Sequence, residues 1–511
     1  MQYLLGIDVG TSGTKTVLFD TTGKAIASNT VEYPLHQPQN GWAEQDPQDW
    51  WNAVKQTTKA VIEKSGVTAS DIKGIGISGQ MHGLVLLDKD GNVLRNSIIW
   101  CDGRTINECK EITDTIGKDR LIEITANPAL PGFTAGKILW VRKHEPEIWA
   151  KAAHILLPKD YIRYMLTGEF ATEVSDASGM NLLDIKKRDW SDEILEKLNL
   201  DKALFAKMYE SCEVTGKVHS QAAAQTGLSE GTVVVGGAGD NAAAAVGTGV
   251  VEQGKAFTTI GTSGVVFAHS ETAEIDPQGR VHTFCAAVPG AYTVMSCTLA
   301  AGLSLKWFRD TLCNQEIETA KLMGVDPYYL MDKQAERIPI GSNRLIFLPY
   351  LMGERSPILD SNSRGAFIGL SAIHTKADML RAVLEGVMYS QRHCLDVLRE
   401  MNAVPDTMLA CGGGGTSPIW RQIMADVYDC PVATVANKEG PALGVAILAG
   451  VGAGIYESVA DACKKVIKYN EAQQPKAENV KAYAPYYKIY CDLYPGIKNS
   501  FADLAELAEL N

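Results

Sequence analysis

The 511-residue sequence has no Cys-x-x-Cys pair and no run of lysines or arginines that resembles a phosphate-tracking arm. Its eleven cysteines are never closer than the eight positions between Cys101 and Cys109, which argues against a zinc site or a disulfide framework. Reduced thiols in a cytoplasmic protein are the simpler expectation. Acidic residues outnumber basic ones, 60 to 48, and the formal charge of −12 makes nucleic acid a poor partner.

Long apolar runs are also missing. The segment before Asp8 is too short for the core of a signal peptide, and the stretch 443–451 is too short and too broken by glycine to span a bilayer. Hydrophobic residues make up 46% of the chain and charged residues 21%, as in ordinary globular proteins. We therefore expect a protein without a membrane partner, built from two large domains or a few smaller ones.

One short pattern occurs twice. Residues 10–13 and residues 261–264 both read Gly-Thr-Ser-Gly, 251 positions apart, and each set lies between two strand-like runs. A second pair joins 233–239 to 408–415, where a strand, a glycine run and a helical stretch follow one another. The two pairs together predict a duplicated α/β fold.

Local signals place a few elements between these landmarks. Asp46-Pro47 is typical of a helix start, an apolar stripe follows from Trp50, and Gly66 is a plausible end. A strand is expected at 72–77, and 473–480 is expected to be a surface connection. The closing helix is expected to pack a core face with a kink at Pro495-Gly496; that face comprises Tyr486, Ile489, Leu493, Ile497, Phe501 and Leu504.

The familiar nucleotide motifs do not fit. A Walker A loop with its lysine at Lys15 would need glycines where Val9 and Thr14 stand. The Gly-x-Gly-x-x-Gly spacing at 74–79 is followed by a turn and a strand rather than a helix. A similar spacing at 237–242 precedes a helix, but the next strand ends without an acidic residue to hold a ribose. A hydride-transfer enzyme is disfavoured.

The repeated glycine turns suit another chemistry. Small residues let backbone N–H groups converge on an anion, and hydroxyls add donors, so two such turns can clasp a polyphosphate. Asp8 precedes the first turn, whereas Thr259 stands at the matching place in the second. A single carboxylate suits a magnesium ion held through its waters with the phosphates, although Asp8 bonding only to turn amides is the alternative.

Asp240 stands where a helix is expected to begin, after Gly239 and before Asn241. An N-cap role alone would explain an isolated aspartate there. Beside two phosphate loops, an ionised carboxylate can instead accept the proton of a hydroxyl that attacks a γ-phosphate. We expect Asp240 to be a catalytic base.

At this point the sequence resembles the FGGY family of carbohydrate kinases, from about Gly6 to about Gly450. The matching segments include 10–13, 42–51, 132–140 and 365–370. Within the family, the xylulokinase members are most similar in Gly79-Gln80-Met81-His82-Gly83, Gly237-Ala238-Gly239-Asp240-Asn241, Leu157-Pro158-Lys159-Asp160-Tyr161, and Leu348-Pro349-Tyr350 with Gly353-Glu354-Arg355.

The resemblance implies two duplicated actin-like, ribonuclease-H-like ATPase domains, 1–246 and 247–511, with the active site in the cleft between them. The first would hold the sugar site and the first phosphate loop, and the second the nucleotide site. The implied activity is ATP-dependent phosphorylation of D-xylulose to D-xylulose 5-phosphate with Mg²⁺. A kinase for ribulose, glycerol or gluconate, and an actin-like ATPase acting as a chaperone or filament, are the alternatives, and a homodimer stays open.

The same resemblance implies roles for matching positions. They are Asp240 as the base; Met81, His82, Asp240 and Asn241 for the sugar; Asp8 for the metal; and Thr11, Ser12, Lys15, Gly261, Thr262, Gly413, Gly414 and Ser417 for the nucleotide. Relatives often carry Asn or Gln where this chain has Cys101, which puts a polar role there in doubt. Arg104 either reaches the substrate or forms a structural ion pair, and His82 by itself would more often be a structural residue.

Overall fold

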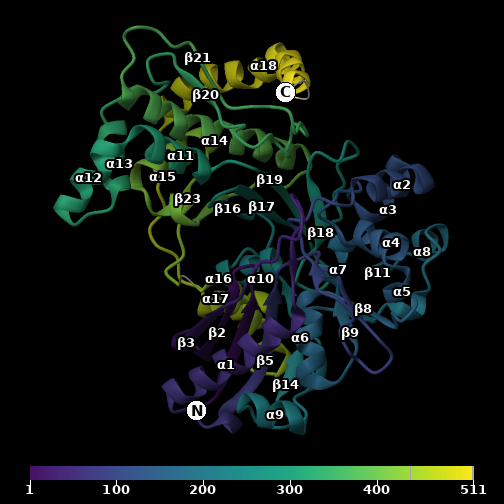
Figure 1. Ribbon diagram of the computed structural model, residues 1–511. Coiled ribbons are helices and arrows are strands. Elements are labelled where there is room, and N and C mark those ends of the chain that lie inside the picture. Colours follow the sequence, from purple (N-terminus) through teal and green to yellow (C-terminus); the bar gives the residue numbers. More distant parts are fainter. Residues whose placement is uncertain (438, 509–511) are drawn as a thin grey trace.

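The computed structural model describes residues 1–437 and 439–508, and two β-sheets dominate it (Figure 1). The first sheet has the strand order β13-β14-β5-β1-β2-β3, with β15 paired to β5. Its strands are β1 (Tyr3–Val9), β2 (Gly13–Asp20), β3 (Ala25–Glu32), β5 (Ile72–Gly79), β13 (Val214–Lys217), β14 (Val233–Val235) and β15 (Ala238–Gly239).

Strand β1 is antiparallel to β2 and parallel to β5. Helix α1 (Pro47–Ser65) covers β2 and β3 on one face of this sheet, and α16 (Gly440–Gly452) lies against β1 and β5. Since helices lie on both faces, β1 is apolar along nearly its whole length rather than at alternate positions.

The predicted start and end of α1 are confirmed. The side chain of Asp46 accepts a hydrogen bond from the backbone N–H of Gln48 at 2.9 Å, Pro47 is the first helical residue, and Gly66 ends the helix at a left-handed φ of 65°. Trp50 is fully buried on its inner face. The strand predicted at 72–77 is also present, as β5.

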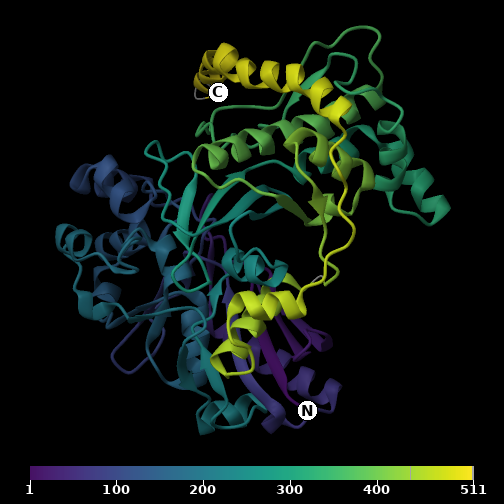
Figure 2. The same ribbon diagram turned by 180° about the vertical axis from the view of Figure 1, so that it is seen from behind.

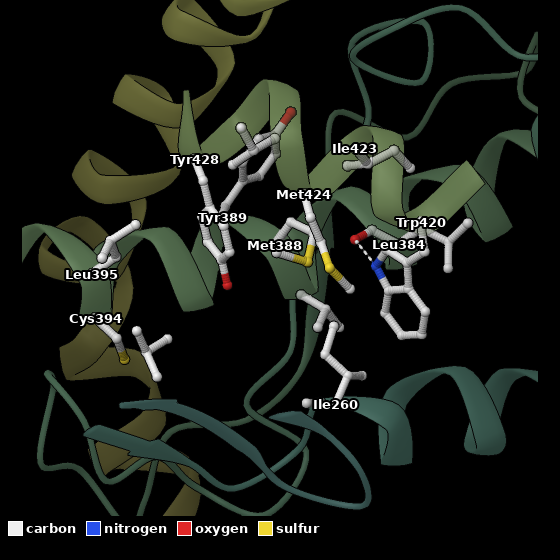
Figure 3. Packing of buried hydrophobic residues seen from close by; sticks show 14 of the residues in the cluster. Ile260, Leu384, Met388, Tyr389, Cys394, Leu395, Trp420, Ile423, Met424 and Tyr428 are labelled. Carbon is white, nitrogen blue, oxygen red and sulfur yellow. Dashed lines mark hydrogen bonds between the residues drawn. The ribbon is translucent and has the colours of Figure 1, made fainter. Parts of the chain in front are cut away.

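The second sheet has the order β18-β19-β17-β16-β22-β23. Its strands are β16 (Lys255–Ile260), β17 (Gly264–Ser270), β18 (His282–Cys285), β19 (Tyr292–Thr298), β22 (Thr407–Cys411) and β23 (Val432–Ala433). Helices α14 (Lys376–Glu400) and α15 (Pro418–Tyr428) pack over it, and Met388, Met424 and Trp420 meet above Ile260 (Figure 3). The Trp420 indole N–H donates to the Leu384 carbonyl at 3.2 Å.

The first predicted repeat corresponds to equivalent strands. The arrangement of β1, β2 and β5 recurs as β16, β17 and β22, with the same antiparallel and parallel pairings. The two turns close alike, because the Gly10 N–H donates to the Gly13 carbonyl and the Gly261 N–H to the Ser263 carbonyl, both at 3.1 Å. The second turn is one residue shorter, since Ile260 pairs with Gly264 whereas Val9 pairs with Thr14.

The second predicted repeat was matched to the wrong strand. In the second sheet β22 lies beside β16, which is the position of β5 in the first sheet, whereas β14 lies one place further out and corresponds to β23. A strand followed by glycines is therefore common to several neighbouring strands of each sheet. The glycine run alone could not tell which neighbour was equivalent.

Two helices cross where the halves of the chain meet. Helix α10 (Asp240–Thr248) packs against α16 through glycines: a Cβ on Gly444 would overlap the Ala243 carbonyl, and one on Gly247 would overlap the Gly440 carbonyl. Helix α16 and the following α17 (Val459–Val466) come late in the sequence, yet they share a core with β1, β2 and β14, as the yellow-green helices beside the purple strands in Figure 2 show. We retain the division after residue 246 as a proposal for the duplicated halves. We add to it that α16 and α17 of the second half pack on the sheet of the first half.

The remaining helices are divided between the two halves of the chain. Those of the first half are α2 (Ile106–Ile116), α3 (Lys118–Thr125), α4 (Thr134–His144), α5 (Pro146–Trp149), α6 (Pro158–Thr167), α7 (Val174–Ala177), α8 (Asp192–Lys197) and α9 (Ser220–Thr226). Those of the second are α11 (Gly302–Leu312), α12 (Asn314–Met323), α13 (Pro327–Ala335) and α18 (Ala477–Ala508). Within the described residues no helix is long and apolar enough to cross a membrane.

The closing helix differs from its prediction. Helix α18 begins at Ala477, inside the expected surface connection, and runs through Pro495 as one helix. The predicted face is confirmed at Phe501, which is buried, and at Tyr486, Leu493 and Ile497, which pack against the core. Ile489 and Leu504 are instead 49% and 59% exposed, and the most buried residues of the helix are Tyr483 and Tyr490. The aromatic residues pack on α14, and spacing alone put the stripe on a face that is partly in solvent.

Candidate active site

Asp8 and Asp240 stand at the ends of neighbouring elements of the first sheet. Asp8 is paired with Ser78 of β5 and Lys15 of β2, and Asp240 follows β15, which pairs with the last residues of β5. Burial raises the pKa of Asp8, and the neighbouring Ser78 hydroxyl and the charge of Lys15 offset this only in part. The buried Oδ1 of Asp8 has no hydrogen-bond partner within the described residues.

The Asp240 carboxylate is held on one side only. Its Oδ1 accepts from the Asn241 backbone N–H at 2.7 Å and from the Asn241 side-chain amide at 3.1 Å. Burial and the nearby charge of Asp8 raise its pKa from 3.8 to about 7. In the part of the chain that the structure describes, Oδ2 makes no hydrogen bond, so this oxygen can accept a proton near neutral pH.

Met81 and His82 follow β5, and Met81 lies against Gly239, the residue before Asp240. A Cβ on Gly239 would lie 2.9 Å from Met81 Cγ, so the residue before Asp240 must be small. His82 has a left-handed φ of 68°. Its carbonyl accepts from Lys137 Nζ at 2.8 Å and from the Thr134 hydroxyl at 3.1 Å, which fixes this uncommon conformation.

The His82 ring has a defined tautomer. Its Nδ1 lies 2.8 Å from the Gly179 carbonyl, which can only accept, so Nδ1 carries the hydrogen and Nε2 carries the lone pair. Burial and the charge of Lys137 lower the pKa of His82 to about 3. The neutral ring therefore offers an acceptor for a hydroxyl at Nε2.

Two groups of supporting residues had no predicted role. Lys137 Nζ also donates to the Gly132 carbonyl at 2.9 Å, and burial lowers its pKa to about 7. Ser175 accepts from the Gly239 backbone N–H at 3.2 Å and donates to the Glu173 carboxylate at 2.9 Å. Lys137 is 55 positions from His82 and Ser175 is 64 positions from Gly239, and the only sequence signal was the presence of Lys137 in a family segment.

The turn at residues 10–13, which was predicted to bind phosphate, is tied to its surroundings. The Thr11 hydroxyl accepts from the Trp100 indole N–H at 2.9 Å and lies 3.3 Å from the Gln80 amide oxygen, so it faces the end of β5. Ser12 is exposed. Lys15 forms a 2.5 Å ion pair with Glu439, which precedes α16.

A cavity of about 560 Å³ lies in the second half and brings five predicted residues together: Gly261, Thr262, Gly413, Gly414 and Ser417. The Ser417 hydroxyl caps α15 and donates to Asp332 at 2.7 Å. Sequence reasoning missed Asp332 and the neighbouring Tyr328 and Tyr329 of α13, which line the same cavity. Thr11, Ser12 and Lys15 lie outside this lining.

Arg104 forms the structural ion pair that was one of its two alternatives. Its buried guanidinium lies 2.7 Å from Asp102 and 2.8 Å from Glu44, and it stacks on the Trp42 ring at 3.7 Å. Cys101 is exposed beside it.

The donor set fits magnesium better than a fully protein-bound metal. Among the residues placed by the structure, no cluster of three His, Cys, Asp or Glu side chains forms a metal site. Asp8 offers one unpaired carboxylate oxygen, as expected for an ion that keeps most of its waters and binds phosphates.

The chain is similar along most of its length to proteins of one known family. Residues 3–247 match the N-terminal domain of the FGGY family of carbohydrate kinases, and residues 256–453 match its C-terminal domain. A xylulose kinase from Bacillus subtilis is 42% identical over 98% of both chains, and a gluconokinase from the same organism is 31% identical over 99% of this chain and 98% of its own. The crystal structure of a xylulose kinase from Rhodospirillum rubrum superposes with a TM-score of 0.91 at 30% identity, covering 98% of this chain and 100% of that chain.

Proposed function

The chain belongs to the FGGY family of carbohydrate kinases, and from this premise we propose that it phosphorylates D-xylulose to D-xylulose 5-phosphate. Family membership makes the chain an ATP-dependent sugar kinase. The choice of sugar is supported by the higher identity with xylulose kinases, 42% against 31% for the gluconokinase.

The observation that carries the proposed mechanism is the environment of Asp240. Its free Oδ2 and its pKa of about 7 suit a general base that takes the proton of the C5 hydroxyl as this oxygen attacks the γ-phosphorus of ATP. His82 Nε2 and the Asn241 amide would bind other hydroxyls, and Met81 would shape the pocket.

The nucleotide would occupy the 560 Å³ cavity, with its phosphates directed toward the first turn. Thr11, Ser12 and Lys15 are proposed to contact them, and Lys15 would then exchange Glu439 for phosphate. Magnesium would neutralise phosphate charge, with Asp8 holding its water shell. Since these groups lie on different halves, we expect the halves to close around the substrates and exclude water.

The free cysteines bear on the cellular compartment of the protein. All eleven cysteines are free. This supports the proposal that the enzyme is cytoplasmic, where thiols stay reduced. A homodimer stays open as part of the same proposal.

A panel of sugars tests the substrate. With ADP release as the readout, D-xylulose should have the highest kcat/KM among D-xylulose, L-xylulose, D-ribulose, L-ribulose, glycerol and gluconate, because buried polar groups reject sugars that leave them unpaired. A panel led by another compound would contradict the xylulose assignment and keep the kinase. No sugar-dependent ADP release would favour the actin-like ATPase alternative.

Asp8→Ala should lower magnesium-dependent turnover by ~10² or more while D-xylulose binding stays within about threefold of the parent. The reason is that this carboxylate is proposed to orient the hydrated ion and not the sugar. Turnover is measured across a magnesium titration, and sugar affinity by calorimetry. Asp90→Ala, in an exposed turn, is the control. A collapse of sugar affinity with an unchanged magnesium dependence would show that Asp8 has another role.

A further inference from the structure

Arg355 is an unusual arginine. Arg337 and Arg344 are exposed, and thirteen other arginines bond to carboxylates or backbone carbonyls. Arg355 is only partly exposed, and within the described residues its guanidinium has no hydrogen bond or ion pair. The N–H donors of this guanidinium are therefore available to an acceptor that arrives from solution.

Four hydrogen bonds fix the backbone around Arg355. Glu354 Oε1 accepts from the Arg355 N–H at 2.8 Å and from the Leu299 N–H at 2.9 Å. The Arg355 carbonyl accepts from the Leu359 N–H at 2.8 Å, and the Ser356 N–H donates to the Cys297 carbonyl at 3.2 Å. The loop between β20 (Ile346–Leu348) and β21 (Ala366–Ile368) therefore presents this side chain from a rigid support.

The side chain reaches across to the first half of the molecule. A Cβ on Gly132 would lie 4.0 Å from Arg355 Nη2. Lys137 Nζ donates to both the Gly132 carbonyl and the His82 carbonyl. The Phe133 ring lies 4.6 Å from the His82 ring. The guanidinium therefore stands on the His82 side of the sugar site.

Charge supports this placement. The positive charge of Arg355 contributes to the lowered pKa values of His82 and His282, whereas the pKa of Asp240 is governed by burial, Asp8 and Asn241. Arg355 is thus electrostatically close to the histidines and remote from the proposed base.

We propose that Arg355 is a sugar-binding residue supplied by the second half, and that its N–H groups donate to the C2 carbonyl and C1 hydroxyl oxygens of the ketose. A ketose bound with its C5 hydroxyl at Asp240 places this end away from the base, toward His82. The planar fork of a guanidinium suits two adjacent oxygens, and His82 Nε2 adds an acceptor for a hydroxyl hydrogen. The proposal rests on the proposed function for the identity of the sugar.

The test compares D-xylulose with xylitol, in which the C2 carbonyl is reduced. Arg355→Gln should raise the KM for D-xylulose about 10- to 100-fold, as expected for the loss of a charged hydrogen bond, with a much smaller change in kcat. The preference for D-xylulose over xylitol should fall about tenfold. The KM for ATP and the unfolding temperature should stay unchanged. The KM of Arg355→Lys for D-xylulose should fall between those of the parent and of Arg355→Gln.

Arg364→Gln is the matched control, because Arg364 lies in the same loop, is exposed and bonds only to the Ser361 and Ser363 carbonyls. A KM for D-xylulose within twofold of the parent in Arg355→Gln, or an unchanged ketose preference, would overturn the assignment. If the parent enzyme prefers ribulose, only the proposed substrate is wrong. The Arg355→Gln comparison is then made with ribulose and the polyol formed by reducing its carbonyl. A parent that prefers glycerol or gluconate would overturn both.

Discussion

Asp240→Asn is expected to lower kcat by ~10² to 10⁴ while the fold and the affinity for D-xylulose stay close to those of the parent. The amide keeps the shape of the side chain but cannot take the proton of the attacking hydroxyl. Stopped or coupled assays give kcat, and calorimetry gives sugar affinity. Asp46→Asn is the control. Asp46 also stands at a helix N-terminus, but it caps α1 and has no proposed role in the reaction.

The pH dependence separates a base from a binding residue. The pKa of Asp240 is raised from 3.8 to about 7, so its deprotonated fraction, and with it kcat/KM, should increase as pH rises through about 7. In Asp240→Asn this increase should disappear from the residual rate. Turnover within about tenfold of the parent, or an unchanged pH profile in the variant, would exclude Asp240 as the base.

Gly444→Ala is expected to lower the free energy of unfolding by about 3 kcal/mol, the upper part of the range for overpacking. The added Cβ would overlap the Ala243 carbonyl and lie 2.9 Å from the Gly247 nitrogen, and both are backbone atoms that cannot rotate away. Relief would require α10 and α16 to separate. Urea unfolding followed by circular dichroism measures the change.

The same substitution at Gly440 provides the control. Gly440 is the first residue of the same helix, and a Cβ there meets nothing within 4 Å. Alanine is intrinsically the better helix residue, so Gly440→Ala should leave stability unchanged or slightly higher. Equal effects of the two substitutions would mean that helix propensity, and not the close crossing, sets the requirement for glycine.

Local chemistry in the sequence was sufficient for part of the fold. The Gly-Thr-Ser-Gly turns identified β1 with β2 and β16 with β17, because a tight turn between strands requires particular residues at fixed places. The cap at Asp46 gave the start of α1 for the same reason. Such local signals do not give the order of strands in a sheet. The second predicted repeat consequently matched β22 with β14, whereas its equivalent in the first sheet is β5.

The candidate site divides in the same way. Asp8 and Asp240 were predicted from the turns and helix starts that hold them. Arg355 lies near Gly132 of the other half of the chain, and Lys137 donates to the His82 carbonyl 55 positions away, so neither periodicity nor a cap connects these residues. Groups that meet only through tertiary contacts are therefore harder to foresee than residues placed by a turn or by a helix start.

The packing of α16 on the first sheet also sets an order of events during synthesis. Gly6 and Gly76 face α16 so closely that a Cβ on either would overlap its backbone, and Leu4 and Val17 lie in the same buried cluster. On the ribosome, 361 positions separate the end of β5 from the start of α16, which is about 20 to 70 s at ordinary rates of translation. One face of the first sheet therefore stays uncovered by α16 until most of the second half has been synthesised.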